Sequence, residues 1–373
     1  MSHAMEQSAR NAQTRTSFQG PPALSDYDAD TLAAQFAGWG CKPVHAARLL
    51  HAFYLGGGQV DLAALRLGKS VESHLGHDIL LRQSHIITRS SSVDGTEKLL
   101  VGFGRGGAVE SVLMPAHDPA RAAGCISSQI GCAMRCDFCA STRGGLERNL
   151  EAGEIVEQFL HLRHLAQSQN RRLSTIVLMG MGEPMHNLGN VMTAIRRIAA
   201  PGMGALGGRQ ITVSTVGIVP GMDELAAADL KVHLAVSLHA ADDVTRSRIV
   251  PMNRHYNVGQ IISAARRFSE HTGRIVTIEY CLLKDVNDSD GQAQLLADLL
   301  HGFRTHVNLI PYNPIGAALS GAVYATPDAS RVQAFYGILF GRGVVVHMRL
   351  PRGHDVNAAC GQLRQSVRDD RSV

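Results

Sequence analysis

Six short apolar runs, separated by stretches of helical pattern, follow one another through residues 124–313 of this 373-residue chain. The intervening segments place apolar residues three and four positions apart, as in residues 151–167, which is the spacing of a helix with one buried face. Apolar strands that alternate with helices form parallel sheets covered by helices. We therefore expect an α/β fold whose sheet curls into a full or partial (βα)6 barrel. The expected strands are 124–130, 174–182, 210–217, 232–239, 275–283 and 306–313.

The segments that flank this alternation have a different character. Residues 23–84 place apolar side chains at helical spacing between glycine clusters, which predicts a small helical accessory domain. Residues 85–118 contain β-rich runs separated by the turn sequences SSVDG and GRGGA, which predicts a short β extension. The core then spans 119–350, and a C-terminal segment spans 351–373. The polar stretch 1–22 lacks the apolar core of a signal peptide, so we expect a disordered lead-in.

Composition excludes a membrane span and leaves the partner open. No apolar run approaches the ~20 residues that a transmembrane helix needs, so we expect no membrane association and a cytoplasmic location. The net charge of +4 is mildly basic, and most of the 36 basic residues are arginine. Arginine suits phosphate recognition, but a GC-rich genome also favours its codons. Charge alone therefore does not identify a nucleic-acid partner.

Three of the seven cysteines lie within the segment GCAMRCDFCAS, residues 131–141. Cytoplasmic thiols stay reduced, so a disulfide framework is disfavoured. A structural zinc site takes four ligands, and Cys125 would have to join Cys132, Cys136 and Cys139. An iron–sulfur cluster held by three thiolates instead leaves one iron open to a substrate. In a βα barrel the loops that follow strands carry the chemistry, and this segment follows the first expected strand.

The Cys-x3-Cys-x2-Cys spacing resembles that of the radical S-adenosylmethionine superfamily. The resemblance implies a 4Fe–4S cluster with Cys132, Cys136 and Cys139 as ligands and S-adenosylmethionine bound at the open iron. The sequence MGMGEP, residues 179–184, ends the second expected strand, and the resemblance implies that Gly182 and Glu183 contact the cofactor's amino group. Glycine permits close approach, and a carboxylate beside an ammonium forms a charge-assisted hydrogen bond.

Over nearly its whole length the sequence resembles the RlmN/Cfr-type radical S-adenosylmethionine RNA methyltransferases, and within that family it is most similar to the RlmN group. The motifs that carry this resemblance extend well beyond the cluster signature. They are CISSQIGCAMRCDFCAS (125–141), VLMGMGEPMHNL (177–188), IVPMNRHYN (249–257), HVNLIPYNP (306–314) and AACGQL (358–363).

The resemblance implies roles for two further cysteines in a route that uses two molecules of S-adenosylmethionine. Cys360 takes an intact methyl group, a 5′-deoxyadenosyl radical removes hydrogen from it, and the carbon adds to adenine as a protein–RNA adduct. Cys125 then attacks the Cys360 sulfur in a transient disulfide and releases the product. Glu110 matches the family's proton acceptor, with Cys125 as its rival. The other implied cofactor contacts are Ser214, Ser237, Leu238, His239 and Asn313.

The same resemblance implies carbon 2 of an adenosine in the peptidyl-transferase region of 23S rRNA as the target, together with a transfer RNA anticodon-loop adenosine. Carbon 8 of the same ribosomal nucleotide, the antibiotic-resistance reaction, is the alternative. We also expect a low-potential electron donor such as flavodoxin, a monomer, and a helical N-terminal domain that helps to hold RNA. Two other classes stay open: a radical enzyme acting on a small molecule or peptide, and a zinc-bound RNA-binding protein.

Overall fold

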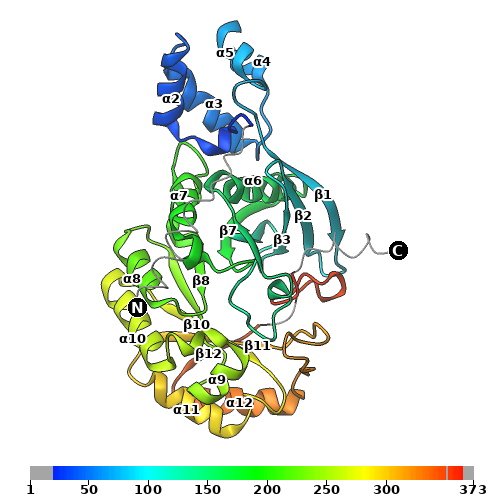
Figure 1. The fold of residues 1–373 in the computed structure, drawn as a ribbon, viewed down its shortest axis with the longest axis vertical. Helices are drawn as coiled ribbons and strands as arrows, with labels where there is room; N and C mark the ends of the chain where they lie inside the picture. The colour runs from blue at the N-terminus through cyan, green and yellow to red at the C-terminus, as the bar shows by residue number, and fades with distance from the viewer. Residues whose placement is uncertain (1–19, 350–351, 364–373) are drawn as a thin grey trace, which may run out of the picture.

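The structure is a computed structural model, and it describes residues 20–349 and 352–363. The expected α/β fold is confirmed: ten strands form one sheet, and helices alternate with the strands of its parallel part (Figure 1). The expected lead-in 1–22 lies almost wholly outside the described residues, and the segment 351–373 lies partly outside them. None of the described helices is long and apolar enough to cross a bilayer.

The elements follow the chain in the order in which the sequence alternates. The helices are α2 (Ala29–Gly38), α3 (Val44–Leu55), α4 (Leu62–Leu65), α5 (Lys69–His74), α6 (Ala152–Ser168), α7 (Leu188–Ala199), α8 (Val219–Ala227), α9 (Asp243–Ile249), α10 (Val258–Thr272), α11 (Asp290–Leu300) and α12 (Ala329–Gly341). The strands are β1 (Ser84–Ser91), β2 (Glu97–Phe103), β3 (Ala108–Pro115), β4 (Arg121–Cys125), β5 (Gln129–Gly131), β6 (Leu146–Asn149), β7 (Arg172–Leu178), β8 (Ile211–Thr215), β9 (His233–Ser237), β10 (Val276–Leu282), β11 (Thr305–Pro311) and β12 (Val345–Met348).

All six expected strands are present as the parallel series β4, β7, β8, β9, β10 and β11. The sequence did not predict β12, which adds a seventh parallel strand beside β11. The expected first strand, 124–130, was misplaced, because β4 begins earlier, at Arg121. It ends at Cys125, because the backbone N–H groups of Ser128 and Gln129 then turn to the Met181 carbonyl, and β5 begins a separate ribbon. The parallel strands place their carboxyl ends along one edge of the sheet.

The β-rich segment continues the same sheet. Strands β1, β2 and β3 pair in antiparallel fashion, and β3 pairs with β4 through registers such as Val112 opposite Cys125. The core helix α6 covers β3, β4 and β7 and is buried almost all round, with Ile155, Phe159 and Leu162 at most 1% exposed. The β extension therefore lies directly beside β4, the first parallel strand, and close to the groups at the carboxyl end of that strand.

The N-terminal helices α2 to α5 lie at one end of the molecule, far from α9, α11 and α12 at the other (Figure 1). Their joint with the core is polar and buried. The fully buried Glu157 of α6 accepts hydrogen bonds from the Ser25 hydroxyl at 2.7 Å and from the backbone N–H groups of Gln83 and Ser84 at 3.1 and 2.7 Å. One carboxylate thus joins the two ends of the N-terminal segment to the core.

We predict that Glu157→Ala lowers the free energy of unfolding by about 2–4 kcal/mol, because it leaves buried donors without an acceptor. Chemical denaturation followed by circular dichroism measures the change. Glu224→Ala, on the exposed face of α8, is the matched control and should stay within about 0.5 kcal/mol of the parent. Equal stability of the two variants would mean that this carboxylate does not hold the N-terminal helices in place.

Candidate active site

A cavity at the carboxyl edge of the parallel strands gathers most of the residues that the sequence singled out. Its walls come from the cysteine segment, the ends of β7, β8, β9 and β10, and the C-terminal segment. Nine of the expected site residues line it: Cys132, Cys136, Cys139, Gly182, Glu183, Ser214, Ser237, His239 and Cys360. Cys125, Glu110, Leu238 and Asn313 do not line this cavity.

The three motif cysteines lie in the loop of the β5–β6 ribbon. The loop closes where the Cys132 backbone N–H donates to the Gly145 carbonyl at 2.9 Å. Gly131 precedes this bond with φ of +73°, and a Cβ there would meet the Gly145 oxygen at 1.9 Å. Only glycine can therefore occupy position 131 in this loop. Gly131, the first residue of the segment GCAMRCDFCAS, thus allows the loop to close, and the three cysteines come after it in this closed loop.

Burial raises the pKa of all three motif thiols, to about 12 for Cys132, so each is protonated in the protein alone. A metal that bound to these thiols would therefore have to displace their protons. Within the described residues no three His, Cys, Asp or Glu side chains converge on one metal ion. Thiolates of a 4Fe–4S cluster each bind a different iron, and soft sulfur ligands beside an open cavity suit such a cluster.

Glu183 is 2% exposed and faces the cavity from the turn after β7. Its carboxylate accepts the Met185 N–H at 3.1 Å and the Val216 N–H at 2.9 Å, while burial raises its pKa to about 7. Gly182 has φ of +101°, and a Cβ there would meet Gln129 backbone nitrogen at 2.8 Å. The turn thus holds the Glu183 carboxylate in a buried position, where an approaching ammonium group would keep it ionised.

The ends of β8 and β9 add small polar groups. The Ser214 and Ser237 hydroxyls lie 3.3 Å apart. His239 has φ of +60°, and its Nδ1 accepts the Cys281 N–H at 3.0 Å, which places the ring proton on Nε2. Burial lowers its pKa to about 3, so the imidazole is neutral. Leu238 is fully buried beneath these residues and donates its N–H to the Glu279 carbonyl.

The C-terminal segment returns to the cysteine loop and brings Cys360 into the cavity. The Ala140 N–H donates to the Gly361 carbonyl at 2.7 Å, and the Ser141 hydroxyl donates to the Leu363 carbonyl at 2.7 Å. Asn313, after β11, donates from Nδ2 to the Cys360 carbonyl at 3.3 Å. Asn313 therefore positions the backbone of Cys360. Residue Cys360 is itself exposed to solvent at the mouth.

The turn between β1 and β2 anchors the same segment from the other side. Asp94 accepts the Gly353 N–H at 3.0 Å, and Asp355 accepts the Ser92 hydroxyl at 2.5 Å. Although partial burial opposes it, hydrogen bonding from Gly353 and Thr96 lowers the pKa of Asp94 to about 2. The β extension thus holds the segment that carries Cys360, a role that the sequence did not suggest.

Cys125 and Glu110 lie behind the cavity on neighbouring strands. Cys125 ends β4, and burial, with a further contribution from the nearby Cys360, raises its pKa to about 12. Glu110 is 1% exposed on β3 and forms an ion pair with Lys98, whose ammonium also donates to the Asn357 carbonyl at 3.3 Å. Cys125 is therefore close enough to Cys360 for their charges to interact, whereas Glu110 is linked through Lys98 to Asn357 of the C-terminal segment.

Sequence reasoning missed three residues of this site. Cys281 is a buried residue of the core that also lines the cavity holding Cys360. Glu279 on β10 lines the same cavity and is 6% exposed. Arg246 is fully buried and donates to the carbonyls of Leu238 and Val216 and to the Asn253 side chain. A charged residue within an apolar run, such as Glu279 in IEYCLL, was the available signal.

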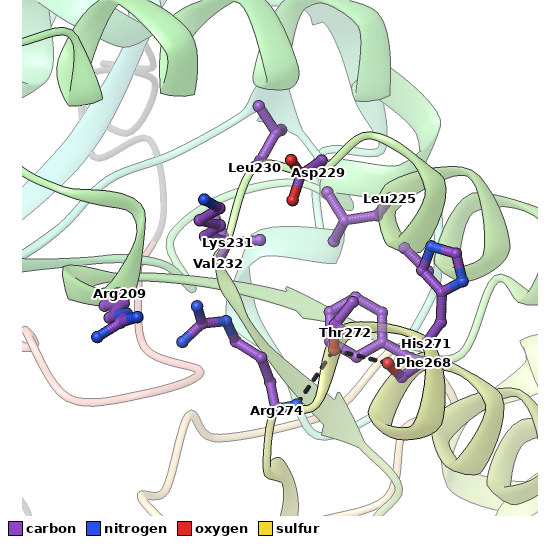
Figure 2. A pocket seen from close by; sticks show the side chains of 11 residues that line it. Arg209, Leu225, Asp229, Leu230, Lys231, Val232, Phe268, His271, Thr272 and Arg274 are labelled. Atoms are coloured by element: carbon purple, nitrogen blue, oxygen red, sulfur yellow. Dashed lines mark hydrogen bonds between the residues drawn. The ribbon is translucent and has the colours of Figure 1, made fainter.

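A second cavity lies at the opposite, amino edge of the sheet, at the starts of β9 and β10 (Figure 2). Its lining is basic on one side, with Arg209, Lys231 and Arg274, and apolar on the other, with Leu225 and Phe268. No thiol lines it. This cavity therefore lacks the redox and nucleophilic groups of the carboxyl edge and is not the candidate active site.

The comparison with known proteins assigns the class first. Residues 126–295 match the Radical SAM superfamily, where SAM denotes S-adenosylmethionine. A crystal structure of a radical SAM methyltransferase from Sphaerobacter thermophilus is 41% identical and covers 92% of this chain and 99% of that chain, with a TM-score of 0.87. The chain is a radical SAM protein, a class whose cofactors are a 4Fe–4S cluster and S-adenosylmethionine. The fold and superfamily expected from the sequence are confirmed.

Curated relatives assign the family. A probable dual-specificity RNA methyltransferase RlmN 1 from Opitutus terrae is 49% identical and covers 92% of this chain and 97% of the relative. A probable dual-specificity RNA methyltransferase RlmN from Bacillus subtilis is 37% identical and covers 94% of this chain and 95% of the relative. The chain belongs to the RlmN family of dual-specificity RNA methyltransferases, as the resemblance of its motifs implied.

We predict that Asp94→Asn loosens the C-terminal segment by about 1–2 kcal/mol, because it removes a charged acceptor. Hydrogen exchange of residues 352–363 should then accelerate about tenfold, with Asp30→Asn on α2 as an exposed control. Since the folded pKa lies below the ordinary 3.8, this stabilisation is present above that value and is lost as the pH falls through about 2. Unchanged exchange in the variant would mean that other bonds hold the segment.

Proposed function

We propose that this protein methylates carbon 2 of an adenosine in 23S rRNA, in the peptidyl-transferase region, and an adenosine in the anticodon loop of transfer RNA. The observation that carries this proposal is that Cys360, remote in sequence, lines the same cavity as the three motif cysteines. The curated relatives named RlmN, which match nearly the whole chain, support the choice of RNA as the substrate.

Each residue has a separate task in this proposal. Cys132, Cys136 and Cys139 hold the cluster, which, once bound and reduced, supplies the electron that cleaves S-adenosylmethionine. The turn residues Gly182 and Glu183 hold the cofactor's amino group, and the remaining contacts come from the strand ends. These remaining contacts are Ser214, Ser237, Leu238, His239 and Asn313.

The two other cysteines act in succession, in a turnover that consumes two molecules of S-adenosylmethionine. Cys360 accepts the methyl group and carries it to the adenine ring as a covalent adduct. Cys125 attacks the Cys360 sulfur, and the disulfide that forms releases the methylated base. Glu110 takes the ring proton, with Cys125 as the alternative acceptor. The interaction of the Cys125 and Cys360 charges supports the second step, because exchange needs the two sulfurs close together.

Adenine must leave its stack to reach a cavity at this depth. We propose that the N-terminal helical domain, residues 23–84, and the β extension, residues 85–118, hold the surrounding RNA. The remaining parts of the proposal are a low-potential donor such as flavodoxin, a monomeric enzyme and a cytoplasmic location. Carbon 8 is the second candidate target, favoured by the sequence VQAFYGIL, residues 332–339, which resembles the antibiotic-resistance group.

The test incubates the reconstituted protein with RNA, S-adenosylmethionine and a strong reductant under anaerobic conditions. Mass spectrometry of the digested RNA should detect 2-methyladenosine. Cys136→Ala should lose the iron, and Cys360→Ala should keep it but form no product. Exclusive 8-methyladenosine would select the other target, and the absence of any methylated adenosine together with absence of 5′-deoxyadenosine would refute the proposed function.

We predict that Cys125→Ala accumulates protein crosslinked to RNA, because the adduct on Cys360 then has no resolving thiol. A denaturing gel should show a slow band that nuclease treatment removes. Cys41→Ala, which replaces a thiol far from the cavity in the N-terminal helices, should behave like the parent. A Cys125→Ala variant that turns over without this band would exclude Cys125 as the resolving thiol.

A further inference from the structure

Methyl transfer to Cys360 releases a proton that some group must accept. A thiol cannot attack a sulfonium methyl group and stay protonated. Burial of its sulfur raises the pKa of Cys360 to about 11, with Glu279 as the largest charge contribution. At neutral pH this residue is therefore a thiol that needs a base. The acceptor must lie in the same cavity and have an oxygen or nitrogen that other bonds do not occupy.

Two of the titratable groups in the cavity are poor candidates. Both carboxylate oxygens of Glu183 accept backbone N–H groups, from Met185 and Val216. The imidazole of His239 uses Nδ1 to accept the Cys281 N–H, and burial lowers its pKa to about 3. A group with so low a pKa binds a proton too weakly near pH 7. Among the described residues that line the cavity, Glu279 is the remaining carboxylate.

Glu279 occupies the middle of the parallel sheet. On β10 it is opposite Ser237 of β9 and Asn308 of β11. One oxygen, Oε1, accepts the Asn308 Nδ2 at 2.8 Å, which fixes the carboxylate while no hydrogen bond from a described residue reaches Oε2. The residue is 6% exposed and lines the cavity together with Cys360. The carboxylate is thus held in place by one oxygen, and its second oxygen is available to accept a proton.

The charges around Glu279 favour a role as a base. Burial raises its pKa above the ordinary value, and this moves a carboxylate toward the operating pH, where a general base is most effective. The Asn308 hydrogen bond and the Arg349 guanidinium partly oppose this rise in pKa, so that the ionised carboxylate can still form. The Arg349 charge acts on both Glu279 and Cys360. Glu279 and Cys360 therefore share Arg349 as a cationic neighbour.

We propose that Glu279 is the general base that deprotonates Cys360 when this residue accepts a methyl group from S-adenosylmethionine. The S–H bond of Cys360 breaks and its proton passes to the Glu279 carboxylate, directly or through one water. The sulfur's electron pair forms the new bond to the methyl carbon. The sulfonium–methyl bond breaks, and its electron pair stays on the departing sulfur as a neutral thioether. The Glu279 proton then leaves to solvent at the mouth, where Cys360 is exposed.

The first experiment measures methyl loading alone, without reductant or RNA. The reconstituted full chain is mixed with methyl-labelled S-adenosylmethionine, and S-methylation of the Cys360 peptide is followed by mass spectrometry. Glu279→Gln should load about 100-fold more slowly, as expected for loss of a general base. Glu279→Asp, which keeps a carboxylate, should recover part of the rate. Glu270→Gln, exposed on α10, is the control and should load like the parent.

The second experiment separates a base from a merely structural residue. Alkylation of Cys360 by iodoacetamide in the same variants needs no base held in a fixed direction. Because Glu279→Gln removes a negative charge near the thiol, this alkylation should be as fast as in the parent or faster. Slower alkylation and slower methylation by the same factor would mean that Cys360 is displaced, which overturns the role proposed for Glu279.

This inference rests on the proposed function, and the two fail in different ways. If the parent protein never methylates Cys360, the proposed function is refuted and the base has no reaction to assist. If the parent methylates Cys360 and Glu279→Gln does so at the same rate, only the assignment of Glu279 is refuted. Should Glu279→Gln fold poorly, the Asp variant and the alkylation rate still decide between the two outcomes.

Discussion

The return of the C-terminal segment to the cysteine loop is the contact on which the site depends. The Ala140 N–H to Gly361 carbonyl bond and the Ser141 to Leu363 bond join groups as many as 222 residues apart. Closing so long a loop costs chain entropy that grows only slowly with length, while each hydrogen bond contributes about 0.5–1.5 kcal/mol. Several such bonds are needed to hold the segment. The β1–β2 turn provides two of them, through Asp94 and through Ser92, which donates to Asp355 of the segment, and Asn313 after β11 provides a third.

A parallel sheet explains why so many different segments meet there. The parallel strands β7, β8, β9 and β10 end at the same edge, and each of these ends contributes residues to one cavity. The scaffold residues are apolar and fully buried, for example Val213, Val236 and Ile278, so the ends they support are rigid. Catalytic groups need that rigidity, because small displacements of a reacting atom cost large factors in rate.

The sequence predicted the strands and the cysteine loop well, because apolar periodicity and cysteine spacing are local signals. It did not predict β12, of whose four residues only Val346 is buried, and which follows a helix that could equally end the domain. The placement of Cys360 came from resemblance to a family, since no local pattern brings AACGQL to the cysteine loop. Glu279 was visible as a charge inside an apolar strand, but its access to the cavity depends on the side chains of β9 and β11, which no single segment records.

One buried charge, that of Arg246, links the stability of the site to metal binding by the cysteines. Arg246 is fully enclosed and donates to carbonyl and amide oxygens, with Asp243 reached only through Asn253. Enclosing a cation without a directly bonded anion is costly. Burial lowers the pKa of Arg246 to about 10, and the charge of Cys136 partly opposes that shift. Deprotonation of Cys136 by a bound metal would therefore stabilise Arg246 as well, so that metal loading and the packing of the β8 and β9 ends reinforce each other.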